Sequence, residues 1–271
     1  MTALLHYGFL ERALLAGVFI AVACAVLGVF LILRRDAMIG DGLSHVAFAG
    51  VAIGLFLNVM PLAAALVVSA AAALIIMRLK DRAGLHGDTA IGILSSLGLA
   101  VGILLATLAG SFNVDLMAYL FGDVLAIRPA EVWLSVGLAA VVLAAVFRNY
   151  AMFLYMTFDR ESARVSGVRV GRLDALLMVL TAVTIVLGMK VAGILLVAAL
   201  IVIPAAAGLQ LASSFRMAVL VSATAAVLSV VGGLAAALRF DIPASAAIVI
   251  LCFFVFAVAS LVRGRRIFPG R

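Results

Sequence analysis

The feature that most constrains the fold of this chain is a succession of long apolar runs separated by short polar stretches. A transmembrane helix needs about 20 predominantly apolar residues to cross a hydrocarbon core of about 30 Å. Because 68% of the residues are hydrophobic and only 11% are charged, the chain is too apolar for a soluble domain, which carries about 25% charged residues. We therefore predict that residues 1–271 form a single all-α transmembrane domain, a bundle of eight or nine helices. The candidate crossings are 13–33, 40–57, 62–77, 90–110, 131–147, 173–189, 191–212, 217–238 and 243–262.

The basic residues are distributed unevenly between the two sides that this topology defines. If the first helix ends in the cytoplasm and the helices then alternate in direction, 15 of the 19 lysines and arginines lie in cytoplasmic segments. The outer side holds Arg12, Arg128, Lys190 and Arg239. Such an excess of Lys and Arg in cytoplasmic loops is typical of multi-pass membrane proteins. We predict an outer N-terminus and a cytoplasmic C-terminus, and we attribute the net charge of +7 to topology and not to a nucleic-acid partner.

Asp41 and His45 stand out because they place two ionisable side chains inside the second apolar run, in the stretch MIGDGLSHVAFAG at residues 38–50. Residues four apart share one face of a helix, so these side chains are expected to lie side by side. At 1.5 Å per residue, His45 lies about 15 Å along the helix axis if the helix begins at Arg34 and Arg35. If the helix begins at Met38, the distance is about 10 Å. Either depth falls within a hydrocarbon core of about 30 Å.

An ionisable side chain at this depth costs at least about 2.5–3.5 kcal/mol, so it faces a cavity or a partner group. A carboxylate oxygen beside an imidazole nitrogen suits a divalent transition metal such as zinc, manganese or iron. Two alternatives stay open: a hydrogen bond between Asp41 and His45 that only joins helices, and a proton relay in a secondary transporter. An intramembrane metalloenzyme is disfavoured, because the chain has three widely spaced histidines and no HExxH motif.

Three further aspartates are candidates for additional metal contacts or for the outer mouth of a pathway, because metal sites usually have four to six ligands. Asp115 and Asp123 lie in the segment 111–130, which is too polar to cross the membrane. If that segment re-enters the membrane, Asp115 can close over the pair from the outside. Asp241 lies between the last two apolar runs, in RFDIPASA. For Asp115 and Asp241, the alternative is that each carboxylate caps the N-terminus of a helix.

One predicted cytoplasmic loop, residues 148–172, is much longer than the others. A long ordered loop commonly serves to dock a partner. Within it, residues 159–166 read as a short helix, and Gly167 stands in the position where glycine usually ends a helix. The chain contains no GxxxxGK[ST] motif, so any ATP that drives the protein must be bound by another subunit.

Six motifs occur in the same order as in a known family of membrane proteins. They are RRDAMIGDGLSHVAFAG, DTAIGILSSLGLAVGILL, YLFGDVLAI, FDRESARVSGV, VAGILLVAALIVIPAAAGLQL and FDIPASAAIVIL. The chain resembles the integral-membrane permease subunits of ABC importers for zinc, manganese and iron, and the matches cover most of its length. This resemblance implies a fold similar to that of the vitamin B12 and siderophore importer permeases, with fewer helices.

The resemblance also implies partners and roles for individual residues. We expect a homodimer in the bacterial cytoplasmic membrane, with two cytoplasmic ATPase subunits and an extracytoplasmic protein that delivers Zn²⁺ or Mn²⁺ as cargo, with Fe²⁺ as a further candidate. No permanently bound cofactor is expected. Asp41 and His45 match metal-coordinating positions of the family, and Asp115 matches an acidic position near its outer gate. The family's coupling helix, which rests in a groove of the ATPase, falls on Phe158, Asp159, Glu161, Arg164 and Gly167. A proton-coupled secondary transporter that uses Asp41 and His45 is the alternative function.

Overall fold

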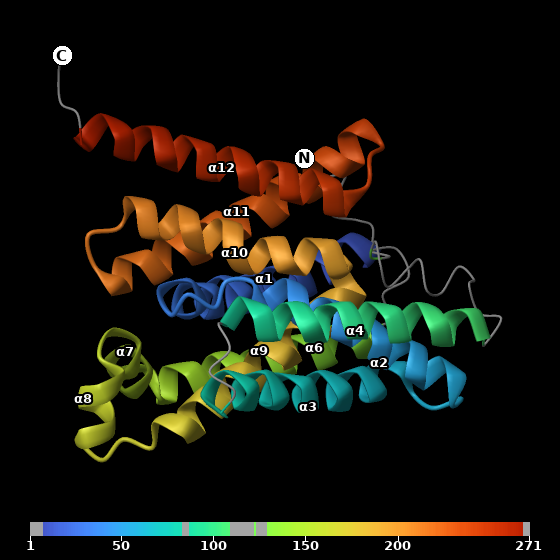
Figure 1. The fold of residues 1–271 in the computed structure, drawn as a ribbon. Helices are drawn as coiled ribbons and strands as arrows, with labels where there is room; N and C mark the ends of the chain where they lie inside the picture. Colours follow the sequence, from blue (N-terminus) through green and yellow to red (C-terminus); the bar gives the residue numbers. More distant parts are fainter. Residues whose placement is uncertain (1–7, 83–86, 109–121, 123–128, 268–271) are drawn as a thin grey trace.

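The computed structural model describes residues 8–82, 87–108, 122 and 129–267, and the elements it assigns there are helices (Figure 1). Helices satisfy every backbone hydrogen bond within the segment, which a hydrocarbon environment demands. In chain order they are α1 (Gly8–Leu33), α2 (Ile39–Phe56), α3 (Pro61–Arg82), α4 (Gly87–Leu108), α6 (Pro129–Arg148), α7 (Tyr150–Phe158), α8 (Arg160–Val165), α9 (Val170–Ala192), α10 (Ile194–Leu211), α11 (Phe215–Phe240) and α12 (Ala244–Ile267).

The predicted all-α transmembrane fold is confirmed, and each of the nine apolar runs coincides with a helix. Within the described residues, seven helices are long and apolar enough to cross a membrane by themselves. An eighth crossing results if α6 and α7, which meet at an angle of 65°, are counted as one broken span. The run at 191–212 falls short of the usual length, because a break at Gly193 separates α9 from α10 and leaves the apolar stretch Leu196–Leu211.

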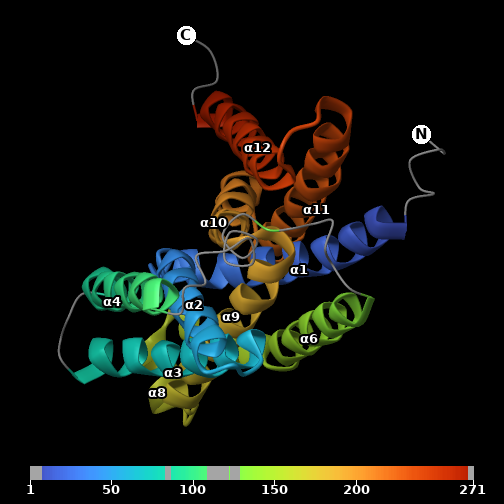
Figure 2. The ribbon, with the colours of Figure 1, turned by 90° about the vertical axis from the view of Figure 1, so that its right-hand side faces the viewer.

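Helix α1 lies at the centre of the bundle, where it contacts α6, α9, α10 and α11 (Figure 2). Helix α2 is even more deeply enclosed, since 72% of its apolar window is buried, compared with 22% in α4 and in α12. The peripheral helices present large apolar side chains such as Leu97 of α4 and Phe253 of α12 to the outside. That distribution suits a bundle whose outer helices face lipid or other apolar surfaces while α2 is held by protein on most sides.

Two glycines let the neighbouring helices approach α2 at backbone distance. A Cβ added to Gly98 of α4 would lie 2.9 Å from the Cα of Val46 and 3.1 Å from the carbonyl oxygen of His45. A Cβ on Gly50 of α2 would lie 2.5 Å from the Cα of Ala65 of α3. Small residues at helix crossings are the usual means of close packing within membranes. The position of α2, and with it Asp41 and His45, is therefore set by direct contact with both α3 and α4.

The helices α7 and α8 project from one end of the bundle, and α12 ends at the same end (Figure 1). An aromatic cluster attaches α7 to the core. The ring centroids of Phe30 and Phe153 are 5.7 Å apart, those of Phe30 and Phe215 are 5.0 Å apart, and Tyr150 packs 5.7 Å from Phe215. The cluster joins α7 to α1 and α11, so the projecting helices have a firm apolar base.

Candidate functional site

Asp41 and His45 lie side by side on α2, as their spacing predicts. Nε2 of His45 is 3.8 Å from Oδ1 of Asp41. This separation exceeds hydrogen-bond length, so the two groups are adjacent without being bonded to each other. An oxygen and a nitrogen at this distance can both reach a cation placed between them, because metal–ligand bonds of about 2.0–2.2 Å to each would span it.

The two side chains occupy the accessible stripe of an otherwise enclosed helix. Between Ile39 and Ala52, all residues of α2 except Asp41 and His45 are buried. The side chain of His45 is 28% exposed and that of Asp41 is 54% exposed. Helix α2 buries its apolar residues and leaves mainly a carboxylate and an imidazole accessible. Its polar face is therefore not covered by the other described helices. Within the described residues, this face is left accessible.

A tight turn between α1 and α2 determines where the pair lies along the helix. Helix α1 ends at Leu33, Arg35 takes a left-handed conformation with φ of 60°, and α2 begins at Ile39. The backbone N–H of Asp36 donates to the carbonyl of Leu31 at 2.8 Å, and Ile39 donates to the carbonyl of Asp36 at 3.1 Å. With the helix starting at Ile39, the shorter of the two predicted depths applies, and His45 lies about 10 Å along the axis.

The structure does not bring a third predicted ligand to this pair. Across the residues it describes, there is no group of three or more His, Cys, Asp or Glu side chains suited to hold a metal. Asp115 and Asp123 lie outside the described residues. Asp241 is exposed and stands apart from Asp41 and His45.

The alternative role considered for Asp241, capping a helix N-terminus, is wrong. Asp241 instead forms the C-cap of α11, where its backbone N–H donates to the carbonyl of Ala237. Its φ of 53° is left-handed. Aspartate tolerates that conformation better than most residues, which makes it a suitable end to a helix.

The short helix predicted within residues 159–166 is confirmed as α8. The Asp159 side chain accepts a hydrogen bond from the backbone N–H of Ser162 at 2.9 Å and so caps the N-terminus. Hydrogen bonds from the side chain and from the backbone N–H of Ser162 stabilise the ionised form and hold the pKa of the Asp159 carboxyl below its ordinary value. At the other end, Ser166 is the C-cap and Gly167 takes φ of 84°, the left-handed conformation expected of a terminating glycine.

One face of α8 is exposed, and so is Phe158, the last residue of α7. Glu161 and Arg164 form a loose surface pair at 3.6 Å, with side chains 80% and 61% exposed. Val165 and Phe158 are apolar yet 88% and 66% exposed. Exposed apolar side chains beside charged ones are the composition of a surface that contacts another protein.

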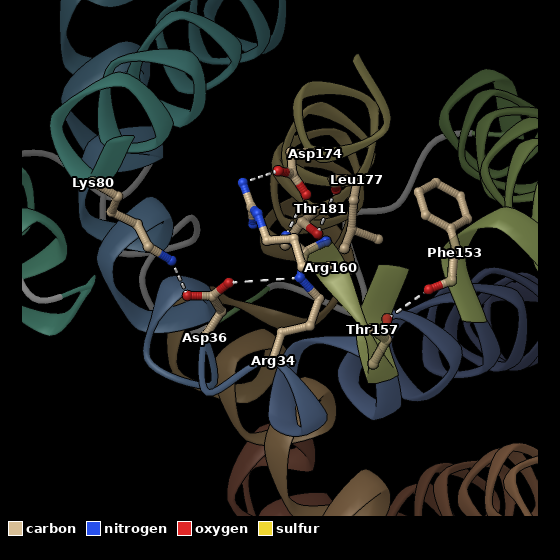
Figure 3. A network of polar contacts seen from close by, with 9 residues as sticks. All are labelled: Arg34, Asp36, Lys80, Phe153, Thr157, Arg160, Asp174, Leu177 and Thr181. Atoms are coloured by element: carbon tan, nitrogen blue, oxygen red, sulfur yellow. Dashed lines mark hydrogen bonds and ion pairs between the residues drawn. The ribbon is translucent and has the colours of Figure 1, made fainter. Parts of the chain in front are cut away.

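Sequence reasoning missed a group of charged residues, which we call the buried ion network: Arg34, Asp36, Lys80, Arg160 and Asp174 (Figure 3). Arg34 and Arg160 both bind the carboxylate of Asp174, and the latter contact is 2.5 Å from Nη2 to Oδ2. Lys80 binds Asp36, and Nε of Arg34 lies 4.0 Å from the same carboxylate. The side chains of Asp36 and Asp174 are 3% and 2% exposed, so both acids are fully enclosed.

The only hint of this network in the sequence is the position of its two acids. Asp36 directly follows Arg34 and Arg35, and Asp174 follows Arg169 and Arg172 at the start of the next long span. An acid embedded in a basic segment at the end of a span signals an ion pair. The partners, however, lie up to 140 residues away, and no local pattern identifies them.

Comparisons with known proteins agree on the type of protein, and each match covers most of the chain. A model of the ABC 3 transport family matches residues 6–263. The high-affinity zinc uptake system membrane protein ZnuB of Haemophilus influenzae is 35% identical over 260 residues, which cover 96% of this chain and 99% of the relative. The manganese transport system membrane protein MntC of Listeria innocua is 33% identical over 261 residues, covering 96% and 93%. Among solved structures, PsaBC from Streptococcus pneumoniae in complex with Fab matches with a TM-score of 0.83 and 31% identity, covering 95% of this chain and 93% of that one.

Proposed function

The chain belongs to the ABC 3 transport family, and on that premise we propose that it is the membrane permease subunit of an ATP-driven importer for a divalent transition-metal ion. Its relatives carry names for zinc uptake and for manganese transport. Zinc and manganese are therefore the favoured cargoes, and the oxygen–nitrogen pair on α2 also admits iron.

The observation that carries this proposal is the contrast between α2 and its two ionisable residues. Helix α2 is the most enclosed of the candidate spans, yet Asp41 and His45 form its accessible stripe and do not hydrogen-bond each other. Ionisable side chains within membrane spans are rare, and those that stay accessible typically mark an ion pathway. We assign Asp41 and His45 as ligands that take over part of the ion's hydration shell during passage, with Asp115 as a further contact and Asp123 and Asp241 at the outer mouth.

The proposal includes the other subunits of such an importer. A homodimer of this chain would supply the surface that faces the accessible stripe of α2. Two cytoplasmic ATPase subunits would receive α8, with Phe158, Asp159, Glu161 and Arg164 at the contact and Gly167 ending the helix. An extracytoplasmic binding protein would hand over the ion. In this arrangement the end of the bundle that carries α8 and the end of α12 faces the bacterial cytoplasm.

The direct test is uptake of radioactive zinc or manganese into proteoliposomes that contain the chain, its ATPase and the loaded binding protein. We expect uptake that requires ATP hydrolysis. Asp41→Ala and His45→Ala should each reduce uptake and equilibrium metal binding at least tenfold, because each removes one of the two ligands that the described residues provide. Asp88→Ala is the matched control, since it removes an exposed aspartate from the first turn of α4 and not of α2.

Two results would contradict the proposal. Uptake that proceeds without ATP hydrolysis would point to the proton-coupled alternative. Unchanged metal binding in correctly folded Asp41→Ala and His45→Ala protein would show that the pair is not the metal site.

A further inference from the structure

The buried ion network connects four separate parts of the chain. Arg160 is the first residue of α8, Asp174 lies in α9, Lys80 lies in α3, and Arg34 with Asp36 forms the turn between α1 and α2. Arg34 is the centre of the network, because it binds Asp174 and approaches Asp36 (Figure 3). A continuous chain of charged side chains therefore runs from α8 to the residues that precede α2.

Among the described residues, the helix contacts of α8 are mainly with α7, and α8 touches α9 only lightly. Helix α7 is held by the aromatic cluster, whose apolar contacts are not directional. The contact between Arg160 and Asp174, in contrast, is an ion pair that joins α8 to a residue that is 2% exposed. Any displacement of α8 acts on Asp174 through this contact.

The far end of the network is joined to the metal-binding helix by a rigid turn. The main chain of Asp36 is bonded on both sides, since its N–H donates to Leu31 and its carbonyl accepts from Ile39, the first residue of α2. Arg35 holds the turn in a left-handed conformation. Asp41 follows Asp36 by five residues. A shift of the Asp36 carboxylate is therefore transmitted to the first turn of α2, where Asp41 lies.

The composition of the network allows it more than one arrangement. It contains three cations and only two carboxylates, so a cation can be exchanged between the acids. Arg34 lies between both acids, bonded to one and 4.0 Å from the other. A cavity of about 20 Å³, bordered by Arg34, Met77, Lys80, Arg160, Asp174 and Met178, adjoins the network. That space is enough for about one water molecule.

From these observations we propose that the buried ion network transmits movement of α8 to α2, and that Arg160, Arg34 and Lys80 are positioning residues that couple the position of α2 to that of α8. The proposal rests on the importer function argued above. When the ATPase displaces α8, Arg160 draws on Asp174, Arg34 moves relative to the two carboxylates, and the turn carries the change into α2. Rearrangement of ion pairs between discrete states is a common basis of such switches.

The test measures how many metal ions are transported per ATP hydrolysed, in proteoliposomes with the ATPase and the loaded binding protein. Lys80→Met is the key variant, because Lys80 lies on α3 and is not part of the helix proposed to contact the ATPase. We expect its transport-to-hydrolysis ratio to fall by about two- to thirty-fold, the range over which such residues modulate coupling. Arg160→Met should fall within the same range. Lys80→Arg and Arg160→Lys, which keep the charge, should restore most of the ratio.

Matched controls are Arg78→Met on α3 and Arg172→Met at the start of α9, which remove exposed basic residues close to the network. Both should keep the ratio of the unaltered protein. A merely structural role of Lys80 would reduce the amount of active complex and lower uptake and hydrolysis together, leaving the ratio unchanged. A ratio in Lys80→Met equal to that of the unaltered protein would overturn the proposal, as would a Lys80→Arg variant as uncoupled as Lys80→Met.

Failure of the importer function itself gives a different result. In that case the unaltered protein shows no ATP-dependent uptake of zinc or manganese, before any variant is considered. If Arg160→Met does not assemble with the ATPase, the Lys80 variants decide the question alone. Metal binding to the variants should stay close to that of the unaltered protein, because Asp41 and His45 are both retained.

Discussion

Two groups of ionisable side chains lie close to the start of α2, and they differ in how their charges are satisfied. The buried ion network encloses its two carboxylates almost completely and surrounds them with three cations. Asp41 and His45 lie a few residues further along, are partly exposed, and approach each other no closer than 3.8 Å. The network pairs its charges with one another within one chain, whereas the pair on α2 has ligand capacity left over.

This difference separates charges that are paired within the chain from charges that remain available to a ligand. A buried charge without a partner is costly, so a self-contained network is sensitive to loss of any member. A partly exposed pair pays little of that cost in the absence of ligand, and it gains when a cation binds. The two groups should therefore respond oppositely to mutation and to metal, and each experiment below tests one side of that contrast.

The largest effect is expected from Asp174→Ala. This change leaves Arg34, whose side chain is only 8% exposed, without its principal carboxylate. Removing one partner of a buried ion pair typically destabilises a protein by about 3–5 kcal/mol. Thermal unfolding of the purified protein in detergent should show a clear drop in Tm. Asp41→Ala is the comparison and should change the stability by no more than about 0.5 kcal/mol, as partly exposed positions usually do. Equal losses in the two variants would remove the contrast.

The second effect is stabilisation by metal, which should depend on the pair and not on the network. A ligand at 100 times its Kd stabilises the folded state by about 2.7 kcal/mol. Zinc or manganese at that concentration should raise the Tm of the unaltered protein. The rise should persist in Lys80→Met and vanish in Asp41→Ala and His45→Ala. A metal-induced rise that survives in both α2 variants would place the binding site elsewhere.

The contrast also explains which features the sequence could predict. The i, i+4 spacing of Asp41 and His45, the caps of α8 at Asp159 and Gly167, and the apolar runs are local patterns, and local geometry follows from them. The network depends on tertiary packing that joins Arg34 to Asp174 across 140 positions. The positive-inside rule predicts on which side of the membrane its basic members lie and says nothing of their partners. Asp241 shows the same limit on a smaller scale, because a carboxylate near two helices can end one or begin the other.

A third and smaller effect concerns the packing that positions the pair. In Gly98→Ala, the added Cβ would lie 2.9–3.1 Å from backbone atoms of Val46 and His45, which is too close for an unstrained contact. Overpacking of this kind costs about 1–3 kcal/mol, and it should also weaken metal binding by moving α2 away from α4. Gly92→Ala on the same helix is the control, since its Cβ meets no atom within 4 Å. Metal titration and Tm of both variants decide the matter. If Gly98→Ala behaves like Gly92→Ala, close contact with α4 does not position the pair.

The smallest effect is expected at Asp159, an exposed charge that caps the N-terminus of α8. Its pKa is lowered in the folded state by the hydrogen bonds from Ser162. A carboxyl whose folded pKa is depressed adds stability above its unfolded pKa of about 3.9, and this stability is lost as the pH falls through the folded pKa. Hydrogen exchange in α8, corrected for the intrinsic rate, should therefore be constant from about pH 5 to 8 and should rise in stronger acid.

Asp159→Asn separates the cap from its charge, because asparagine caps helices as well as aspartate does. Its α8 should keep low exchange at neutral pH and lose the acid dependence, whereas Asp159→Ala should exchange faster at every pH. Neither variant should change metal binding or global Tm, because α8 joins the bundle through Arg160 and not through Asp159. A global loss of stability in Asp159→Asn would mean that the charge of Asp159, like the charges of the buried ion network, stabilises the whole fold. That result would contradict the assignment of Asp159 as a local cap of α8.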